Sequence, residues 1–150
     1  MGVDGEIYQL VLVLHIASVV VGFGAIALNG VYARQAHRRG GAEGVAIGEA
    51  NRAVTRAASS FVYAVPLLGI ALILLSDDTW AFDQLWISLS FLLYLVAAGL
   101  LGAVVIPSQK RISAATGDLD RLQAKVAAGT GAINLLVVVL IALMIWKPGV

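Results

Sequence analysis

The chain has no cysteine among its 150 residues and only two histidines. The absence of cysteine excludes disulfides, thiolate metal ligands, iron–sulfur clusters and thiol catalysis. Charged residues are also scarce, at 13% of the sequence, whereas about 25% is usual for a soluble domain. Because hydrophobic residues make up 60% of the chain, this composition indicates a membrane protein.

Four apolar runs are long enough to cross a bilayer as helices. A helix rises about 1.5 Å per residue, so about 20 residues cross a hydrocarbon core of about 30 Å. The runs cover residues 7–31, 57–75, 85–106 and 126–146. We predict an all-α fold of one domain over residues 1–150, in which four transmembrane helices form a compact bundle of two hairpins. No Asp, Glu, Lys or Arg lies inside a run, which excludes a carboxylate proton relay and a voltage sensor.

The connections between the runs carry nearly all of the basic residues. Residues 33–56 hold five Lys or Arg, residues 107–125 hold four, and Lys147 is the tenth. Because cytoplasmic connections are enriched in Lys and Arg, we expect both termini outside a bacterial cytoplasmic membrane. Anionic lipid head groups explain the bases, and we expect no nucleic-acid partner. Aromatic residues typical of a membrane interface fall at the outer edge, namely Tyr8, Trp80, Trp86 and Trp146.

Glycine and proline mark where the connections bend. We expect residues 33–56 to form a loop at the membrane face, with the second helix beginning near Glu43. Pro107 marks the end of the third span or a bend in it. Gly117 and Asp118 indicate a helix break followed by an N-cap.

His15 is the only residue inside the runs that titrates near neutrality. It belongs to a stripe of small and polar residues at helical spacing, which we expect to face other helices rather than lipid. The stripe consists of Tyr8, His15, Ser18, Gly22, Ala25, Asn29 and Tyr32. On the third run, Tyr94 lies at a similar depth and Ser90 one turn further out.

Two interpretations of this face stay open. In the first, a pocket binds a ligand, since an ionisable residue inside a membrane is a candidate functional residue. The pocket would be formed by His15, Ser18, Gly22, Ser90 and Tyr94. In the second, His15 is structural and bonds to a neighbouring hydroxyl. Both predict a neutral His15 between the first and third spans, with a ring nitrogen within hydrogen-bond reach of Tyr94 or Ser90.

A second polar layer is predicted in the inner half of the bundle from Tyr63, Pro66, Thr130 and Asn134. Pro66 lies within the second run, where its ring displaces the carbonyl of Val62 and bends the helix. A carbonyl freed inside a membrane needs another donor, and we expect Asn134 or Thr130 to supply it. The alternative is that these side chains form ordinary interhelical hydrogen bonds.

The first run contains the sequence Leu12-Val13-Leu14-His15-Ile16, followed by Gly22-Phe23-Gly24. With the later Pro107-Ser108-Gln109-Lys110-Arg111, this pattern resembles a bacterial family of predicted integral membrane proteins, domain of unknown function 2269. The first helix is also similar to that of haem-linked protoporphyrinogen oxidases and copper-resistance membrane proteins. That similarity implies that His15 is a haem or metal ligand. The chain lacks the Tyr-Leu-Pro-Arg sequence and the third-span lysine of the oxidase pattern.

Three functions are compatible with these observations. We favour a non-enzymatic membrane protein that binds a lipophilic ligand or a partner protein through the His15 face. The alternatives are a haem-binding redox enzyme and a small transporter, which four helices would form as a homo-oligomer. Haem is the candidate cofactor. A metal site built from histidines alone is not expected, because His37 lies in a basic connection.

Overall fold

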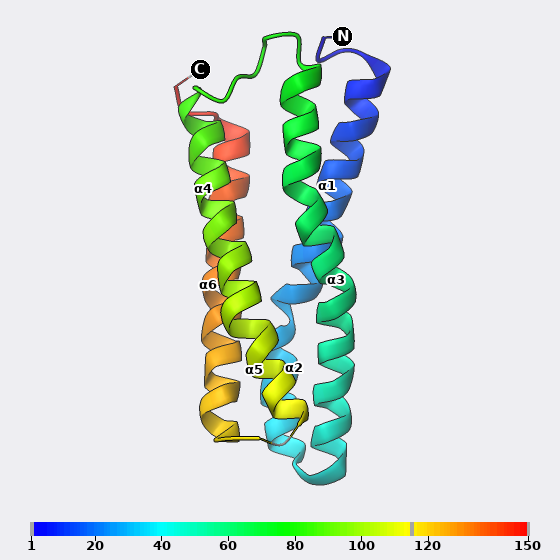
Figure 1. Ribbon diagram of the computed structural model, residues 1–150, viewed down its shortest axis with the longest axis vertical. Coiled ribbons are helices and arrows are strands. Elements are labelled where there is room, and N and C mark those ends of the chain that lie inside the picture. The colour runs from blue at the N-terminus through cyan, green and yellow to red at the C-terminus, as the bar shows by residue number, and fades with distance from the viewer. Residues whose placement is uncertain (1, 115, 150) are drawn as a thin grey trace.

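The computed structural model describes residues 2–114 and 116–149. Their secondary structure is helical, in the order α1 (Glu6–Ala27), α2 (Asn29–Arg39), α3 (Gly41–Leu75), α4 (Leu85–Leu100), the π-helical segment η1 (Leu101–Val105), α5 (Ile106–Ser113) and α6 (Leu119–Trp146). α1 continues into α2, and α4 continues through η1 into α5, so the chain forms four long rods (Figure 1). Each rod is long and apolar enough to cross a membrane, which confirms the predicted all-α membrane fold.

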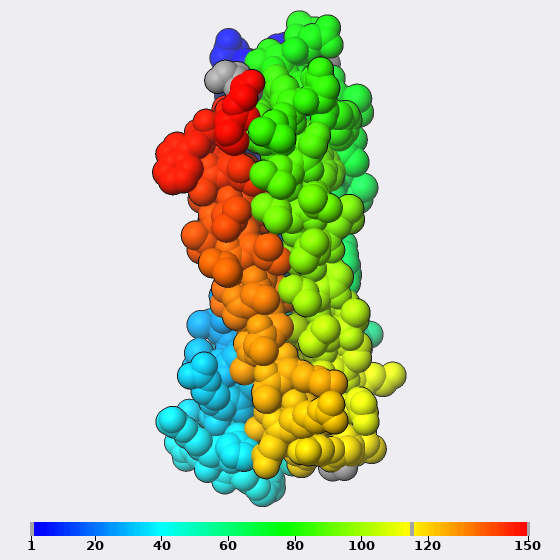
Figure 2. All heavy atoms as spheres, turned by 90° about the vertical axis from the view of Figure 1, so that its left-hand side faces the viewer, coloured from blue at the N-terminus to red at the C-terminus, as the bar shows by residue number. Residues whose placement is uncertain are grey.

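The two ends of the bundle differ. The terminal end carries both termini and the connection between α3 and α4, and the basic end carries the turn at Gly40 and the connection between α5 and α6 (Figure 1). α1 packs on α3 and α4 packs on α6, whereas α1 does not approach α4 in the described part of the chain. The terminal half therefore consists of two helix pairs. Figure 2 shows α4 and α6 side by side along one face.

The first connection is much shorter than predicted. Residues 33–56 were expected to hold a loop before a second helix that begins near Glu43, whereas they are helical except for Gly40, and the second helix begins at Gly41. Gly40 and Gly41 have φ angles of 61° and 49°, a left-handed conformation that costs glycine little because it has no Cβ. A Cβ at Gly44 would collide with the carbonyl of Ala36, so a third glycine lets α2 and α3 approach closely. The glycines thus form a tight reversal between two helices that continue past the apolar runs.

The two prolines inside the rods are accommodated in different ways. α3 stays helical across Pro66, and its axis changes direction part-way along (Figure 1). Pro107 lies in the first turn of α5, where its missing N–H is tolerated. Before it, the N–H of Ile106 bonds to the carbonyl of Leu101, five residues back, which widens the helix. The third rod therefore continues past Pro107 to Ser113.

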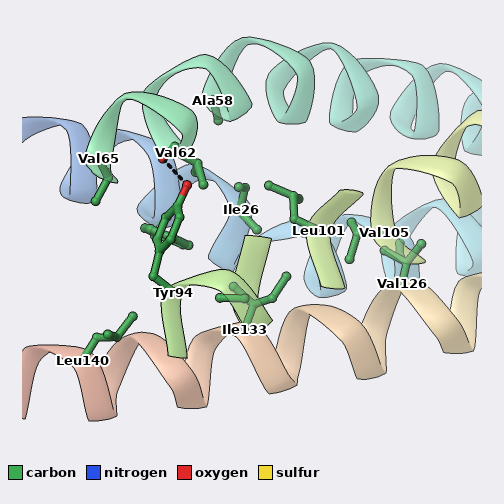
Figure 3. Close-up of a cluster of buried hydrophobic side chains, with 13 residues drawn as sticks. Ile26, Ala58, Val62, Val65, Tyr94, Leu101, Val105, Val126, Ile133 and Leu140 are labelled. Carbon is green, nitrogen blue, oxygen red and sulfur yellow. Dashed lines mark hydrogen bonds between the residues drawn. The ribbon is translucent and has the colours of Figure 1, made fainter. Parts of the chain in front are cut away.

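One local prediction, the N-cap at Asp118, can be compared directly with the structure. Asp118 is the N-cap of α6, as predicted, and its carboxylate accepts a hydrogen bond from the backbone N–H of Arg121 at 3.1 Å. A cluster of buried apolar side chains fills the middle of the bundle (Figure 3). Its fully buried members include Ile26, Val62 and Ile133. This core fills the bundle on the basic-end side of the space between the two helix pairs.

Candidate functional site

A cavity of about 360 Å³ lies in the terminal half of the bundle, between the pair α1–α3 and the pair α4–α6. Its volume is at the lower end of the range of about 300 to 1,000 Å³ that is usual for small-molecule sites. The wall is mostly aliphatic and aromatic. Its residues with polar groups are Tyr8, His15, Trp80, Trp86, Ser90, Tyr94 and Lys147.

His15 is buried in this wall, with 7% of its surface exposed. Its Nδ1 lies 3.1 Å from the carbonyl oxygen of Val65 on α3. The ring rests against Gly69, where a Cβ would be 3.5 Å from ring Cε1. The predicted contact of His15 with Tyr94 or Ser90 is therefore wrong. α1 packs on α3 and not on α4, so the closest acceptor is a backbone carbonyl beside Pro66.

The bond to Val65 determines which ring nitrogen of His15 carries the hydrogen. A carbonyl oxygen only accepts, so Nδ1 must donate. In neutral imidazole, Nε2 then holds a lone pair and is an acceptor. Among the described residues, the hydrogen bond of His15 is the one that Nδ1 makes to Val65, and Nε2 has no donor. His15 thus gives the cavity an unused hydrogen-bond acceptor.

Tyr94 links the two helix pairs at the bottom of the cavity (Figure 3). Its hydroxyl donates to the carbonyl of Val62 at 3.0 Å, and Pro66 is the residue that deprives this carbonyl of its helical donor. A side chain does take up the freed carbonyl. The donor is Tyr94 on α4, however, and the prediction of Asn134 or Thr130 on α6 is wrong.

Tyr94 and His15 lie at nearly the same depth, as the helical rise predicts. Their acceptors, Val62 and Val65, are three residues apart on α3, which corresponds to about 4.5 Å along the axis. Each side chain therefore binds its own carbonyl in the turn that Pro66 disturbs, instead of binding the other.

The mouth of the cavity is built by the connection between α3 and α4. The hydroxyl of Ser76 accepts a hydrogen bond from the backbone N–H of Trp80 at 3.0 Å. Between them, Asp77 and Asp78 adopt left-handed φ angles of 56° and 63°. This turn brings the indole N–H of Trp80 to the hydroxyl of Tyr8, at 3.0 Å. The Trp80 and Trp86 rings meet edge to face, with centroids 5.3 Å apart. Two aromatic rings thus frame the mouth.

The remaining residues of the predicted pocket occupy different places. Ser90 lines the cavity, but its hydroxyl donates to the carbonyl of Trp86 at 2.6 Å. Ser18 and Gly22 are buried on α1 outside the cavity lining. At Gly22 a Cβ would lie 2.9 Å from the backbone nitrogen of Val62, so this glycine serves the close packing of α1 on α3.

The predicted second polar layer does not form a single cluster. Tyr63 is 48% exposed on the outside of α3. Asn134 donates to the carbonyl of Ala27 at 3.3 Å, at the break between α1 and α2. Thr130 is buried, and its hydroxyl has no partner among the described residues. Pro66 lines the cavity instead.

A different polar cluster, missed by the sequence analysis, joins α2, α3 and α5. The Thr55 hydroxyl lies 2.9 Å from both the Asn29 side-chain oxygen and the Asn51 carbonyl, and it accepts a bond from Gln109 at 3.1 Å. All four residues are buried. The only sequence signal was Asn29 on the polar stripe, since the other three lie outside the apolar runs. The cluster holds the rods together near the basic end.

Comparison with known families covers all four rods. The family model for "Predicted integral membrane protein (DUF2269)" matches residues 9–148. The chain belongs to the DUF2269 family. The match includes the cavity residues from His15 to Lys147 and confirms the resemblance seen in the sequence. No curated protein and no solved structure shows significant similarity to this DUF2269 protein.

Haem is the cofactor that the weaker resemblance implies, and the DUF2269 cavity fits one of its requirements. Metal-bound histidines usually donate their second ring nitrogen to a carbonyl or carboxylate, as His15 does to Val65. His15 Nε2 would then be the atom that holds the iron. A site with three or more protein ligands is a different case, because the described residues contain no group of three His, Cys, Asp or Glu placed to hold a metal.

Proposed function

We propose that this DUF2269 protein is a non-enzymatic integral membrane protein that binds a lipophilic ligand in the cavity between its two helix pairs. The observation that supports the proposal is the His15 hydrogen bond, which leaves Nε2 as an unused acceptor in a mostly apolar wall. Binding sites for small molecules typically combine an apolar wall with a few polar groups that fix orientation. A hydroxyl or amide N–H on the ligand would donate a hydrogen bond to Nε2.

The chemistry of the lining favours binding over catalysis. A nucleophile needs a base within hydrogen-bond reach. Ser90 bonds to the Trp86 carbonyl instead of to His15, and no carboxylate or thiol belongs to the described lining. His15 therefore has no reacting partner among the described residues of the lining.

Brominated lipids test this proposal, because bromine quenches tryptophan fluorescence at short range. Trp80 and Trp86 line the cavity, and Trp146, which is 80% exposed, is removed as Trp146→Phe. The protein is placed in phosphatidylcholine nanodiscs and titrated with methyl 9,10-dibromostearate. We expect quenching that saturates, on top of the linear quenching that arises from partition into the bilayer.

Two glycine variants show whether the saturable quenching comes from the cavity. Gly69→Leu places a side chain beside His15 inside the cavity, and we expect it to abolish the saturable component. Gly24→Leu is the matched control, because a Cβ there meets nothing within 4 Å and Gly24 is exposed. Equal saturable quenching in both variants would refute the cavity as the binding site.

The proposed location is a bacterial cytoplasmic membrane with the basic end in the cytoplasm. Nine of the ten Lys and Arg residues support this orientation. At the basic end, Arg34, His37 and Arg38 line a groove with Asp120, and we propose anionic lipid head groups as its partners. Since the chain has no cysteine, Thr79→Cys and Ala42→Cys each create a single reactive site. An impermeant maleimide added to intact cells should label Cys at position 79 only, and the reverse pattern would invert the orientation.

A haem-binding redox function is the second candidate, and the same His15 geometry supports it. His15 Nε2 would hold the haem iron while the Val65 carbonyl orients the ring, and the bound haem would supply electron-transfer chemistry. Protein purified without denaturation should then show a Soret band that His15→Ala removes. Absence of the band after haem supplementation would exclude this candidate.

A further inference from the structure

We propose that the ligand of the cavity is an anionic amphiphile, whose carboxylate or phosphate head group binds at Lys147 while its apolar body extends inward toward His15. This inference rests on the proposed binding function and specifies the class of ligand. It starts from the placement of Lys147 at the mouth, which the sequence analysis did not connect with the cavity.

The backbone directs the side chain of Lys147 back over the cavity. α6 ends at Trp146, and Lys147 adopts a left-handed conformation with φ 41° and ψ 61°, from which its N–H bonds to the Leu143 carbonyl. A left-handed conformation is uncommon for a residue with a Cβ. Its ammonium nitrogen lies 4.2 Å from the centroid of the Trp80 ring and 5.8 Å from that of Trp86. A cation is thus held against the two aromatic rings that frame the mouth.

This cation has no carboxylate partner in the described part of the chain. Acidic residues occur at the terminal end, but none of them lies within ion-pair distance of Lys147. Lys147 is also the only Lys or Arg that is not in a basic connection. A cation without a carboxylate partner among the described residues, on the lining of an apolar cavity, favours a ligand with an anionic group.

A second group at the mouth also lacks a partner. The indole N–H of Trp86 is buried, and no acceptor for it exists among the described residues. A buried donor without an acceptor destabilises a protein by about 1 to 3 kcal/mol, so a ligand oxygen that accepts a hydrogen bond from it is favoured. Trp86 and Lys147 both line the cavity, so an anionic oxygen at the mouth could serve a donor and a cation together.

The depth of the cavity sets the size of the ligand body. Tyr8 bonds to Trp80 at the mouth, and His15 follows seven residues later on α1, which is about 10 Å deeper. Leu12, Leu72 and Leu140 line the cavity and have only apolar side chains. The ligand therefore combines an anionic head with an apolar body of at least about 10 Å.

The test compares charged and neutral forms of one chain in the fluorescence assay with the Trp146→Phe protein. We expect 9,10-dibromostearate, or a lysophosphatidate carrying the same brominated chain, to bind about 10-fold more tightly than methyl 9,10-dibromostearate. The tighter of the two anions identifies the head group. Lys147→Met keeps the alkyl stem and should reduce both anions to the affinity of the ester. Lys147→Arg should retain the preference, because arginine keeps the charge and stacks on aromatic rings.

A second variant acts on the other half of the head-group site. Trp86→Phe keeps a ring but removes the N–H, and we expect it to weaken anion binding several-fold and ester binding less, because a carboxylate is the stronger acceptor. Equal affinity of acid and ester, with saturable binding that Gly69→Leu still abolishes, would overturn the anionic head group and leave the cavity function standing. Saturable quenching by none of the probes would overturn both.

Discussion

The hydroxyl of Tyr94 lies 3.0 Å from the carbonyl oxygen of Val62, the acceptor that Pro66 leaves without a helical donor. The bond crosses from α4 to α3, between two elements that otherwise touch little. It therefore connects the two helix pairs at the floor of the cavity. Inside a membrane an unpaired carbonyl is costly, so proline and tyrosine act as one unit.

Removal of this hydroxyl should destabilise the protein only while the proline is present. We expect Tyr94→Phe to lower the free energy of unfolding by about 1 to 2 kcal/mol, because the Val62 carbonyl loses its donor. Pro66→Ala restores a backbone N–H at position 66, so Tyr94→Phe should cost about 1 kcal/mol less in that background. Thermal unfolding of the four proteins in one detergent measures the coupling.

The matched control for this double-mutant cycle is Tyr63→Phe. Tyr63 is half exposed on α3, and its hydroxyl takes part in no hydrogen bond among the described residues. We expect no change in unfolding temperature. If Tyr94→Phe costs the same with Pro66 and with Ala at position 66, the carbonyl of Val62 does not depend on Tyr94.

The sequence predicted those features that depend on one helix at a time. Apolar runs and charge placement predicted four spans, and local chemistry predicted the N-cap at Asp118. Helical rise placed His15 and Tyr94 at one depth. Helical rise does not show which helices are neighbours, so Tyr94 or Ser90 was assigned to His15, and Asn134 or Thr130 to the Val62 carbonyl. The actual pairs follow from the packing of α1 on α3 and α4 on α6.

The other differences arise from backbone geometry that composition does not reveal. Glycines at residues 40 and 41 suggested a flexible loop, whereas their left-handed φ angles form a two-residue reversal. In the sequence, Lys147 counted only as the tenth basic residue, and the structure shows that its left-handed backbone brings it to Trp80. The mouth of the cavity was therefore not predictable from spacing.

The hydrogen-bonded cluster around Thr55 should contribute strongly to the stability of the fold near the basic end. Thr55 is 1% exposed and joins Asn29, Asn51 and Gln109. We expect Thr55→Val, which keeps the shape, to lower the free energy of unfolding by about 2 to 3 kcal/mol. Ser59→Ala is the control, because its exposed hydroxyl bonds only to the Arg56 carbonyl one turn away. Equal unfolding temperatures for the two variants would show that the cluster is dispensable.

The tautomer of His15 can be measured directly. If the buried imidazole is neutral, its bond to Val65 places the hydrogen on Nδ1 and leaves Nε2 bare. The chain has two histidines, so His37→Gln leaves a single one to observe. Solid-state NMR of ¹⁵N-histidine in lipid should show a protonated Nδ1 and an unprotonated Nε2 at pH 7. The opposite pattern would place the donor on the cavity side and remove the basis for ligand recognition by His15.

A hydroxyl at the depth of His15 should strengthen binding of an anionic chain. With its carboxylate at Lys147, 10-hydroxystearate carries a donor toward Nε2, which lies about 10 Å below the mouth. We expect it to displace 9,10-dibromostearate at least about 5-fold more effectively than stearate does, since an acceptor in a mostly apolar wall gains a hydrogen bond. His15→Phe should abolish this advantage and leave stearate unchanged. 18-Hydroxystearate, whose hydroxyl passes beyond His15, should show no advantage in either protein. An equal gain from both hydroxyl positions would mean that polarity alone, and not His15, determines the preference.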